Sequence, residues 1–226
     1  MNPLTALSGL FAVTLLSPDQ GAPAPIKQTR ASYHFRMLHA NIQIGDASYE
    51  RMTTATDRRI LLTISETVEG VTLNAVFDTT TKNDGTPEKK LFHGVLGQRP
   101  FSSTALFTVA GVDFTLQDVK GDTQKAIIKP PPNAVIADAS EAWFYKVIPK
   151  KGDSVAFTNF DVQNGKWELT TTTYVGDEQT KVGKTAMPTH HIHVKSDGGE
   201  IDMFLDDSAD IVVMDQVGSL RLERAD

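Results

Sequence analysis

Turn-forming residues recur along this chain at short intervals, and their spacing is the feature that most limits the possible folds. Segments such as "KNDGTP", "GQRP", "KKGD", "QNGK" and "SDGGE" separate stretches rich in Thr, Val, Ile and aromatic residues. Each stretch has about five to ten residues, the usual length of a strand. Within them apolar and polar residues often alternate, as around Tyr33, Phe35 and Met37, which is typical of strands with one buried face. The pattern predicts an all-β antiparallel meander of roughly a dozen strands.

A meander of this length is expected to curl, because sheet twist accumulates and open edges promote aggregation. We therefore predict one domain over residues 31–226, with a sheet curled into a half-barrel or barrel-like form. One segment has helical character: Ser140 can cap a short helix around residues 138–147, and Pro149 would end it. The concave side of the sheet is the place where a ligand would bind, unless the short helix fills it.

Individual turns and edges are also predictable. Asn164-Gly165 predicts a tight type I′ hairpin, because both residues tolerate a positive φ angle. Gly45-Asp46 predicts the first bend, and "VGDE" at residues 175–178 predicts a break between two strands. The Thr-rich "LTTTTYV" at residues 169–175 would suit an exposed edge strand that adds a partner strand.

Charge and cysteine content exclude several classes of function. The net charge is −6, and the Lys and Arg residues are scattered, which argues against a nucleic-acid or anionic-membrane surface. The chain has no Cys, so disulfides, thiolate zinc sites and Cys nucleophiles are excluded. Any metal ion would need His and carboxylate ligands.

The N-terminus carries an apolar run from Leu4 to Leu16, which is too short to span a bilayer but has the length of a signal-peptide core. No Lys or Arg precedes the run, and an N-terminal strand or helix packed on the body is the alternative. We predict that residues 1–24 are a signal peptide or an N-terminal apolar segment and that residues 25–30 are a linker. The expected location is periplasmic or secreted, with no transmembrane span.

The segment "HHIHV" at residues 190–194 is the candidate metal site. On a strand, His191 and His193 point to one face and can hold one divalent ion when a third ligand arrives from a neighbouring strand. The alternative is a solvent-facing strand whose imidazoles bind no metal. The possible third ligands are His34, His39, His93 and an aspartate of the following hairpin such as Asp202.

The acidic hairpin that follows, "EIDMFLDDSADIVVMD", places Asp206, Asp207 and Asp210 in its turn. Clustered oxygens suit calcium, yet the order of the EF-hand loop is missing. A solvated turn that keeps edge strands apart is the better interpretation.

Catalytic motifs are missing from the sequence. There is no G-x-S-x-G elbow, and "VGKT" lacks the earlier glycine of a phosphate-binding loop. Carboxylate pairs for glycoside hydrolysis depend on distance in space, so the sequence leaves them open. The aromatic residues Trp143, Phe144 and Tyr145 are candidates for contact with an apolar ligand, with core packing as the alternative. We expect a protein without enzymatic activity and without a cofactor.

Three segments carry a family resemblance: "YHFRMLHANIQIGDASYER", "EAWFYKVIPKKGDSVAFTNFD" and the closing "TYVGDEQTKVGKTAMPTHHIHVKSDGGEIDMFLDDSADIVVMD". Over residues 31–224 the chain resembles a group of uncharacterised bacterial exported proteins. More distantly it resembles the half-barrel of lipoprotein carriers of the LolA/LolB type. The resemblance implies an envelope location and a cavity for an apolar group, and it supplies no catalytic residues. In those carriers a helix crosses the sheet, and here only residues 134–148 can supply one.

Three hypotheses of function follow. The first is an exported envelope protein that binds an apolar small molecule or lipid in a curved sheet. The second is a metal-binding protein or metal-dependent hydrolase that uses His191 and His193. The third is a structural subunit that assembles through its edge strands. The sequence leaves open the ligand, the oligomeric state and the cleavage of the N-terminal segment.

Overall fold

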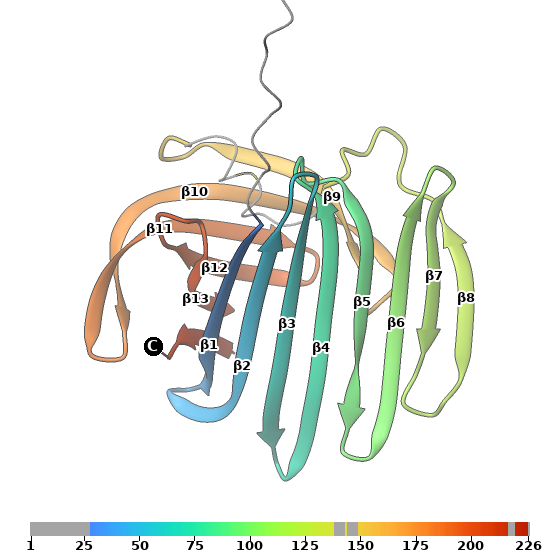
Figure 1. Cartoon of the computed structure of the whole chain (residues 1–226), viewed down its shortest axis with the longest axis horizontal. Helices are drawn as coiled ribbons and strands as arrows, with labels where there is room; N and C mark the ends of the chain where they lie inside the picture. The colour runs from blue at the N-terminus through green and yellow to red at the C-terminus, as the bar shows by residue number, and fades with distance from the viewer. Residues whose placement is uncertain (1–27, 138–142, 144–148, 217–219, 226) are drawn as a thin grey trace, which may run out of the picture.

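A computed structural model of the protein describes residues 28–137, 143, 149–216 and 220–225. Its strands form one antiparallel sheet in the order β8-β7-β6-β5-β4-β3-β2-β1-β14-β13-β12-β11-β10-β9 (Figure 1). The strands are β1 (Thr29–His39), β2 (Ile42–Thr53), β3 (Asp57–Val68), β4 (Val71–Lys82), β5 (Pro87–Leu96), β6 (Arg99–Thr108), β7 (Gly111–Gln117), β8 (Thr123–Ile128), β9 (Ser154–Asp161), β10 (Lys166–Val182), β11 (Thr185–Ser196), β12 (Gly199–Leu205), β13 (Ile211–Gln216) and β14 (Leu220–Arg224). The all-β, barrel-like fold class is thus confirmed, and the described residues form 14 strands.

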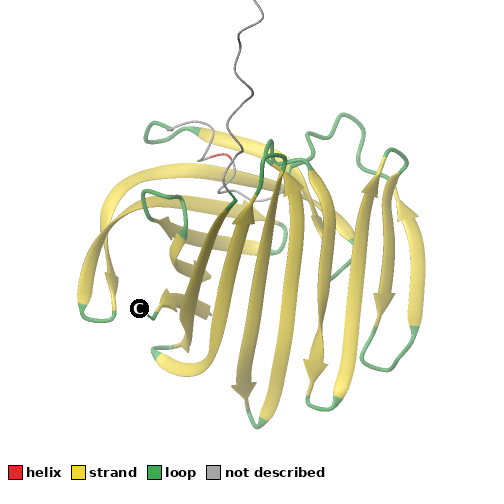
Figure 2. Cartoon of the chain, viewed as in Figure 1, coloured by secondary structure: helices red, strands yellow, loops and turns green. Residues whose placement is uncertain are grey.

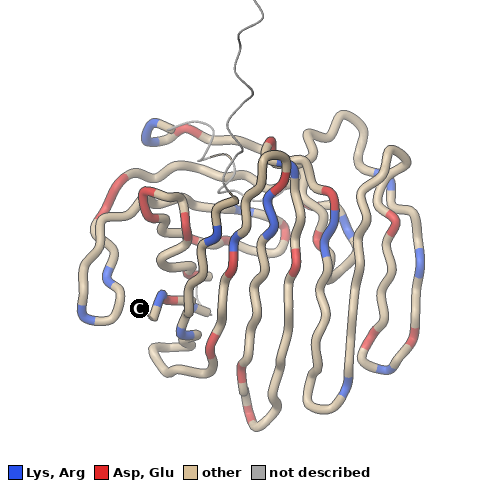
Figure 3. Tube along the Cα trace, viewed as in Figure 1, with Lys and Arg blue, Asp and Glu red and all other residues tan. Residues whose placement is uncertain are grey.

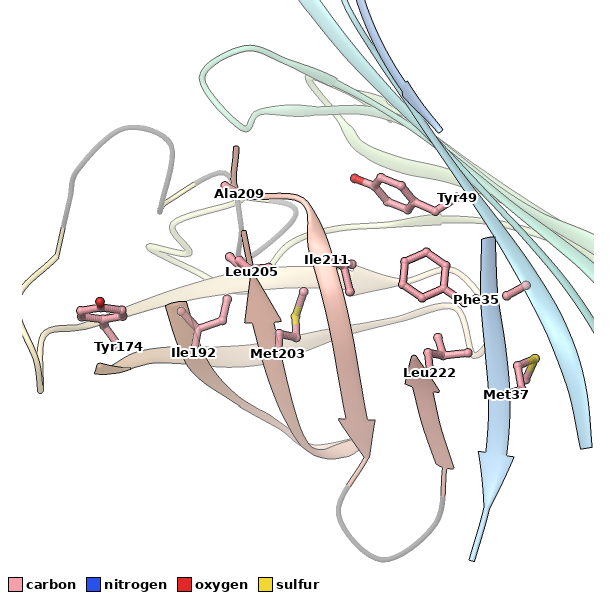
Figure 4. Close-up of a cluster of buried hydrophobic side chains, with 11 residues drawn as sticks. Phe35, Met37, Tyr49, Tyr174, Ile192, Met203, Leu205, Ala209, Ile211 and Leu222 are labelled. Carbon is pink, nitrogen blue, oxygen red and sulfur yellow. The ribbon is translucent and has the colours of Figure 1, made fainter. Parts of the chain in front are cut away.

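Period-two alternation gives the sheet a buried inner face. In β1, Phe35 and Met37 are buried on the inner face, whereas the adjacent His34 points to the outer face and is exposed. In β11, Ile192 is fully buried and its neighbours His191 and His193 lie on the outer face. Figure 4 shows Phe35 on one side of the resulting core, facing Ile211 and other side chains of the C-terminal strands.

Helical structure is nearly absent from the described residues (Figure 2). Trp143 is helical, and the other residues of the helix predicted at 138–147 lie outside the described residues. The predicted signal segment, residues 1–24, and most of the predicted linker lie outside them as well. Within the described part of the chain, no helix has both the length and the apolar character needed to span a membrane.

Two of the predicted bends lie elsewhere. The first hairpin turns at Ala40 and Asn41, whose φ angles of 49° and 66° are those of a type I′ turn. Gly45 instead lies inside β2, where a Cβ atom would approach the carbonyl oxygen of Ser65 to 2.1 Å. The glycine is therefore needed for close strand approach and not for a turn.

The segment "VGDE" does not break the chain either. β10 continues through it as one strand, with a register shift between Tyr174 and Gly176 that marks a bulge. The φ angle of Gly176 is 137°, which suits glycine in the bulge. The hairpin at Asn164-Gly165 is confirmed in position, but its turn spans residues 162–165 and only Gly165 has a positive φ angle.

The Thr-rich segment of β10 is not an edge. Thr171 to Thr173 pair with β9 on one side and with β11 on the other. The ends of the described sheet are β8 and β9. The prediction failed because Thr residues suit any strand with one polar face, and β10 buries Thr170 and Thr172 on its inner side.

No ladder joins β8 to β9 in the described sheet; an isolated backbone bridge between Ile136 and Thr158 and a set of side-chain contacts connect its two ends. Phe160 of β9 packs edge-on against Phe107 of β6 and Phe114 of β7, with ring centroids 6.1 and 5.7 Å apart. Trp167 of β10 completes this aromatic cluster, 5.1 Å from Phe160. The buried Lys90 of β5 donates hydrogen bonds to Asn159 Oδ1 (2.6 Å) and to the Phe160 carbonyl (3.0 Å). The edge strand β9 is thereby held against the concave face of β5–β7.

Candidate functional site

A cavity of about 350 Å³ lies on the concave side of the curled sheet. Its walls come from both halves of the sheet, β1–β4 on one side and β9–β14 on the other. Its apolar lining consists of Phe35, Tyr49, Ile60, Leu62, Phe77, Phe157, Val194, Ile201, Met203, Ile211, Met214 and Leu222. The volume falls in the range of small-molecule pockets in proteins, which is roughly 300–1,000 Å³.

The inner-face alternation of the strands places these residues. Tyr49 lies directly opposite Leu62, and Leu62 lies opposite Phe77, so three strands contribute neighbouring side chains to one wall. Across the cavity, Met203 lies between its partners Ile192 and Met214. Figure 4 shows Tyr49 and Phe35 on one wall, with Met203, Ile211 and Leu222 opposite.

The cavity also has a small polar portion, made of Thr79, Asn159, Glu168, Thr170 and Ser196. Glu168 is 8% exposed, and its carboxylate pairs with the ammonium of Lys166 at 2.8 Å. Because Lys166 lies beside it on the same face of β10, the negative charge of Glu168 is compensated locally.

A buried ion pair lies above the apolar wall, at the turn that precedes β13. Asp210 is 1% exposed and faces Arg51 of β2, with Nη1 of Arg51 3.0 Å from Oδ1 and Nη2 donating to Oδ2 at 3.2 Å. The hydroxyl of Tyr33 also donates to Oδ2, at 3.0 Å. Burial raises the pKa of Asp210, and the guanidinium of Arg51 opposes that rise without cancelling it. The interpretation of this hairpin as a solvated turn between edge strands was therefore wrong for Asp210, because β12 and β13 lie inside the sheet.

His191 and His193 lie together on the outer face, as their spacing predicted. Nε2 of His191 and Nδ1 of His193 are each 2.9 Å from the same oxygen, Oδ1 of Asp202. The ring of His191 also stacks on Phe204, with centroids 4.5 Å apart. Burial of Asp202 disfavours its ionised form, but the hydrogen bonds from the two imidazoles outweigh this effect and lower its pKa.

This arrangement is one of imidazoles bonded to a shared carboxylate. Among the described residues, no group of three or more His, Asp or Glu side chains is arranged to hold a metal ion. The other predicted ligands lie on different strands, His34 and His39 on β1 and His93 on β5, well away from β11 in the strand order. The metal hypothesis for His191 and His193 stays a prediction.

His190 points to the other face of β11 and is engaged on both sides of its ring. Its Nδ1 is 2.6 Å from Oδ1 of Asp177, and its Nε2 is 3.2 Å from Oδ1 of Asp207. Tyr174 donates to the same Asp177 oxygen, and burial together with this hydrogen bond raises the pKa of Tyr174 to about 12. Both ring nitrogens of His190 thus contact carboxylate oxygens.

The aromatic residues predicted to contact a ligand are only partly described. Trp143 is half-buried and packs against the core cluster that includes Phe35 and Leu205. The described residues that line the cavity do not include Trp143. Phe144 and Tyr145 lie outside the described residues, so ligand contact by these three aromatics stays a prediction.

Sequence reasoning missed the actual cavity wall. Its residues come from many strands that lie far apart in the chain, such as Phe35 of β1 and Met214 of β13. The available signal was the alternation of apolar and polar residues in each strand, which identifies these residues as facing inward. That signal does not distinguish a filled interior from a hollow one.

Comparison with known proteins identifies the architecture. A crystal structure from Brucella abortus, of a β-barrel-like protein of the domain of unknown function DUF1849, aligns with a TM-score of 0.53 at 14% identity. The alignment covers 89% of this chain and 97% of that chain. No family model and no curated protein matches this sequence. At this identity the similarity shows a shared barrel-like fold, and the resemblance to LolA/LolB-type carriers stays a prediction.

Proposed function

We propose that this protein is an exported, non-enzymatic envelope protein that holds an apolar or lipid-like ligand inside its curled sheet. The observation that carries the proposal is the cavity of about 350 Å³, whose lining is mostly aliphatic and aromatic. Transfer of an apolar ligand from water to such a lining is favourable by about 0.8 kcal/mol of free energy for each buried methylene group.

The proposal of export is supported by the apolar run from Leu4 to Leu16, which has the length of a signal-peptide core. A carrier role without catalysis is supported by the engagement of His190 with two carboxylates and by the missing nucleophile motifs.

A first experiment compares native and denaturing mass spectra of the protein purified, without detergent, from the cells that produce it. We expect a non-covalent adduct of lipid-like mass in the native spectrum alone. The denatured mass also tests export, since loss of about 24 residues would indicate a cleaved signal peptide.

A second experiment measures the binding of uncharged alkyl alcohols by displacement of the neutral probe N-phenyl-1-naphthylamine. Two additional methylene groups should strengthen binding about tenfold until the cavity is full. Met214→Trp places a larger side chain in the cavity and should abolish this binding. Leu169→Trp is the matched control, because Leu169 is 61% exposed.

Two outcomes would contradict the proposal. One is alcohol binding that does not depend on chain length. The other is equal binding by Met214→Trp and Leu169→Trp, provided that both variants keep the cooperative unfolding of the parent protein.

A further inference from the structure

The polar portion of the cavity lies where the wall formed by β4 and β5 meets the wall formed by β9 and β10. Asn159 of β9 lies directly opposite Glu168 of β10. On the other wall, Thr79 lies directly opposite Lys90, whose ammonium donates to Oδ1 of Asn159 at 2.6 Å. We call this region the polar end of the cavity; its lining residues are Thr79, Asn159, Glu168, Thr170 and Ser196.

The turn between β11 and β12 also reaches the polar end. A Cβ atom on Gly198 would lie 3.4 Å from Oγ of Ser196 and 3.6 Å from Oε2 of Glu168, so both oxygens flank one position. Thr170 follows Glu168 by two residues and therefore faces the same side of β10. The five polar residues thus lie together, and the rest of the cavity lining is aliphatic or aromatic.

The carboxylate of Glu168 can accept a further hydrogen bond. Glu168 is 8% exposed, and the ammonium of Lys166 lies 2.8 Å from its Oε1. In the part of the chain that the structure describes, no group donates to Oε2 of Glu168. The hydroxyl of Ser196 accepts from the backbone N–H of Gly198 at 3.1 Å, which leaves its own hydrogen available to donate. The polar end thus offers a ligand both an acceptor and a donor.

Charges of both signs meet at the polar end. The hydrogen bond from Lys166 to Glu168 raises the pKa of Lys166, and Asp161 and Asp197 add smaller effects in the same direction. The ammonium of Lys90 donates instead to two neutral oxygens. Figure 3 shows a similar mixture over the whole sheet, with Lys and Arg segments interspersed among Asp and Glu segments. Neither sign of charge is therefore in large excess near the cavity.

This balance determines which head group fits the polar end. A cationic head would add a charge beside Lys166 that no further carboxylate of the described lining compensates, and an anionic head would face the carboxylate of Glu168. Either head would bring an unpaired charge among apolar walls, which is unfavourable relative to water. A hydroxyl avoids this cost, because it can donate to Oε2 of Glu168 and accept from Ser196.

We infer that the ligand is an uncharged amphiphile, whose hydroxyl-bearing head is bound at the polar end by Glu168 and Ser196 and whose apolar chain lies against the rest of the cavity lining. This inference rests on the proposed function, because it assigns the head group of the ligand whose apolar part the cavity holds. Such a ligand supplies a donor to Oε2 of Glu168 and leaves the ion pair with Lys166 intact.

The test compares four ligands with ten carbon atoms: decanol, its isomer 1-methoxynonane, decanoate and decylammonium. The ether has the same atoms as decanol but cannot donate a hydrogen bond. Binding to the full chain is measured at neutral pH and below micelle-forming concentrations, by displacement of N-phenyl-1-naphthylamine. We expect decanol to bind at least about tenfold more tightly than decanoate or decylammonium.

A comparison of decanol with the ether in two proteins isolates the hydrogen bond to Glu168. Hydration of the free ligands is the same for both proteins, so it cancels from the change in preference. Glu168→Leu removes the acceptor and should shift the preference toward the ether by at least about tenfold, as expected for a hydrogen bond to a charged group. Glu168→Gln keeps the shape and one acceptor oxygen, and should shift the preference less.

The variants are expected to fold, and a matched control is present on the outer face. The side chain of Lys166 is 49% exposed, so it keeps water as a partner when Glu168 is replaced. Glu200→Leu makes the same substitution at a glutamate that also pairs with a lysine, Lys195, at 2.6 Å. Because Glu200 does not line the cavity, this control should leave the preference for decanol unchanged.

A preference for decanol over the ether that is equal in the parent, Glu168→Leu and Glu200→Leu would overturn the inference. Tighter binding of decanoate or decylammonium than of decanol would overturn it as well. In these cases continued binding of the uncharged alkyl ligands would leave the proposed function standing. Displacement of the probe by glycerol alone, without any gain from an alkyl chain, would show a polyol site and overturn the amphiphile. Failure of every ten-carbon ligand to bind would overturn the proposed function itself.

Discussion

The ion pair between Arg51 and Asp210 leads to a quantitative prediction for Arg51→Met. This variant keeps much of the aliphatic side chain but removes the counter-charge of a carboxylate that is 1% exposed. Removing one partner of a buried pair costs about 3–5 kcal/mol. The hydroxyl of Tyr33 still donates to Asp210, so we expect a loss of about 3 kcal/mol. For a chain of this size, that loss lowers the melting temperature by about 6–12 °C.

The loss should depend on pH. Burial already raises the pKa of Asp210, and removal of Arg51 raises it further. A carboxyl whose pKa is raised on folding favours the folded state only while it is protonated. Its cost therefore grows as the pH rises through the raised pKa and disappears below the ordinary value of the unfolded chain. Relative to the parent protein, Arg51→Met should lose less stability at pH 5 than at pH 8.

Urea unfolding at both pH values measures this difference. Arg51→Met combined with Asp210→Asn should recover most of the loss, because no buried charge is left unpaired. Arg59→Met is a matched control, since Arg59 pairs with Asp78 in an exposed position and should lose less than about 1 kcal/mol. A deficit that is equal at the two pH values, or a double variant as unstable as Arg51→Met alone, would refute this reasoning.

Three further predictions concern other contacts. Gly45→Ala should cost about 2–3 kcal/mol in urea unfolding, because its Cβ would lie 2.1 Å from a backbone oxygen; a variant of parental stability would contradict this. Lys90→Met should cost about 1.5–3 kcal/mol, because the ammonium joins β5 to β9, and a change below about 0.5 kcal/mol would count against that role. The double variant His191→Ala, His193→Ala should raise the pKa of Asp202, which carboxyl NMR measures. The stability that the imidazoles contribute is present above the ordinary pKa of Asp and is lost as the pH falls through the lowered pKa of Asp202. The free energies of unfolding of the parent and the variant should therefore become equal in acid. In the same variant, metal content equal to that of the parent would contradict the metal hypothesis.

Local signals in the sequence predicted the strands well, because alternation and turn residues act over a few positions. These signals failed at two glycines that lie inside a strand and not in a turn. Gly45 is needed beside Ser65, and Gly176 lies in a bulge of β10. The sequence pattern of a glycine next to an acidic residue is the same in each case, so only the strand pairing distinguishes a bend from a close approach.

The candidate site was beyond local reasoning for a different reason. Arg51 follows Tyr49 by two residues, and Arg58 precedes Ile60 by two residues. Side chains two residues apart lie on the same face of a strand, so the sequence already places these cations on the inner face. The order of residues along β2 does not show that the turn before β13 would bring Asp210 to Arg51 across the curl of the sheet. Such distances depend on how tightly the sheet closes, which no single strand specifies.

The way the sheet closes has a consequence for the width of its interior. In a barrel closed by a continuous ladder, the number of strands and their stagger fix the diameter. Here β8 and β9 end the described sheet, and apart from the single bridge between Ile136 and Thr158 the ends meet through side chains, among them the rings of Phe107, Phe160 and Trp167. The volume of a few side chains, and not the hydrogen-bond register of a closed ladder, thus determines the width of the interior. Substitutions among these rings are therefore expected to change the width of the interior more than the pairing of neighbouring strands.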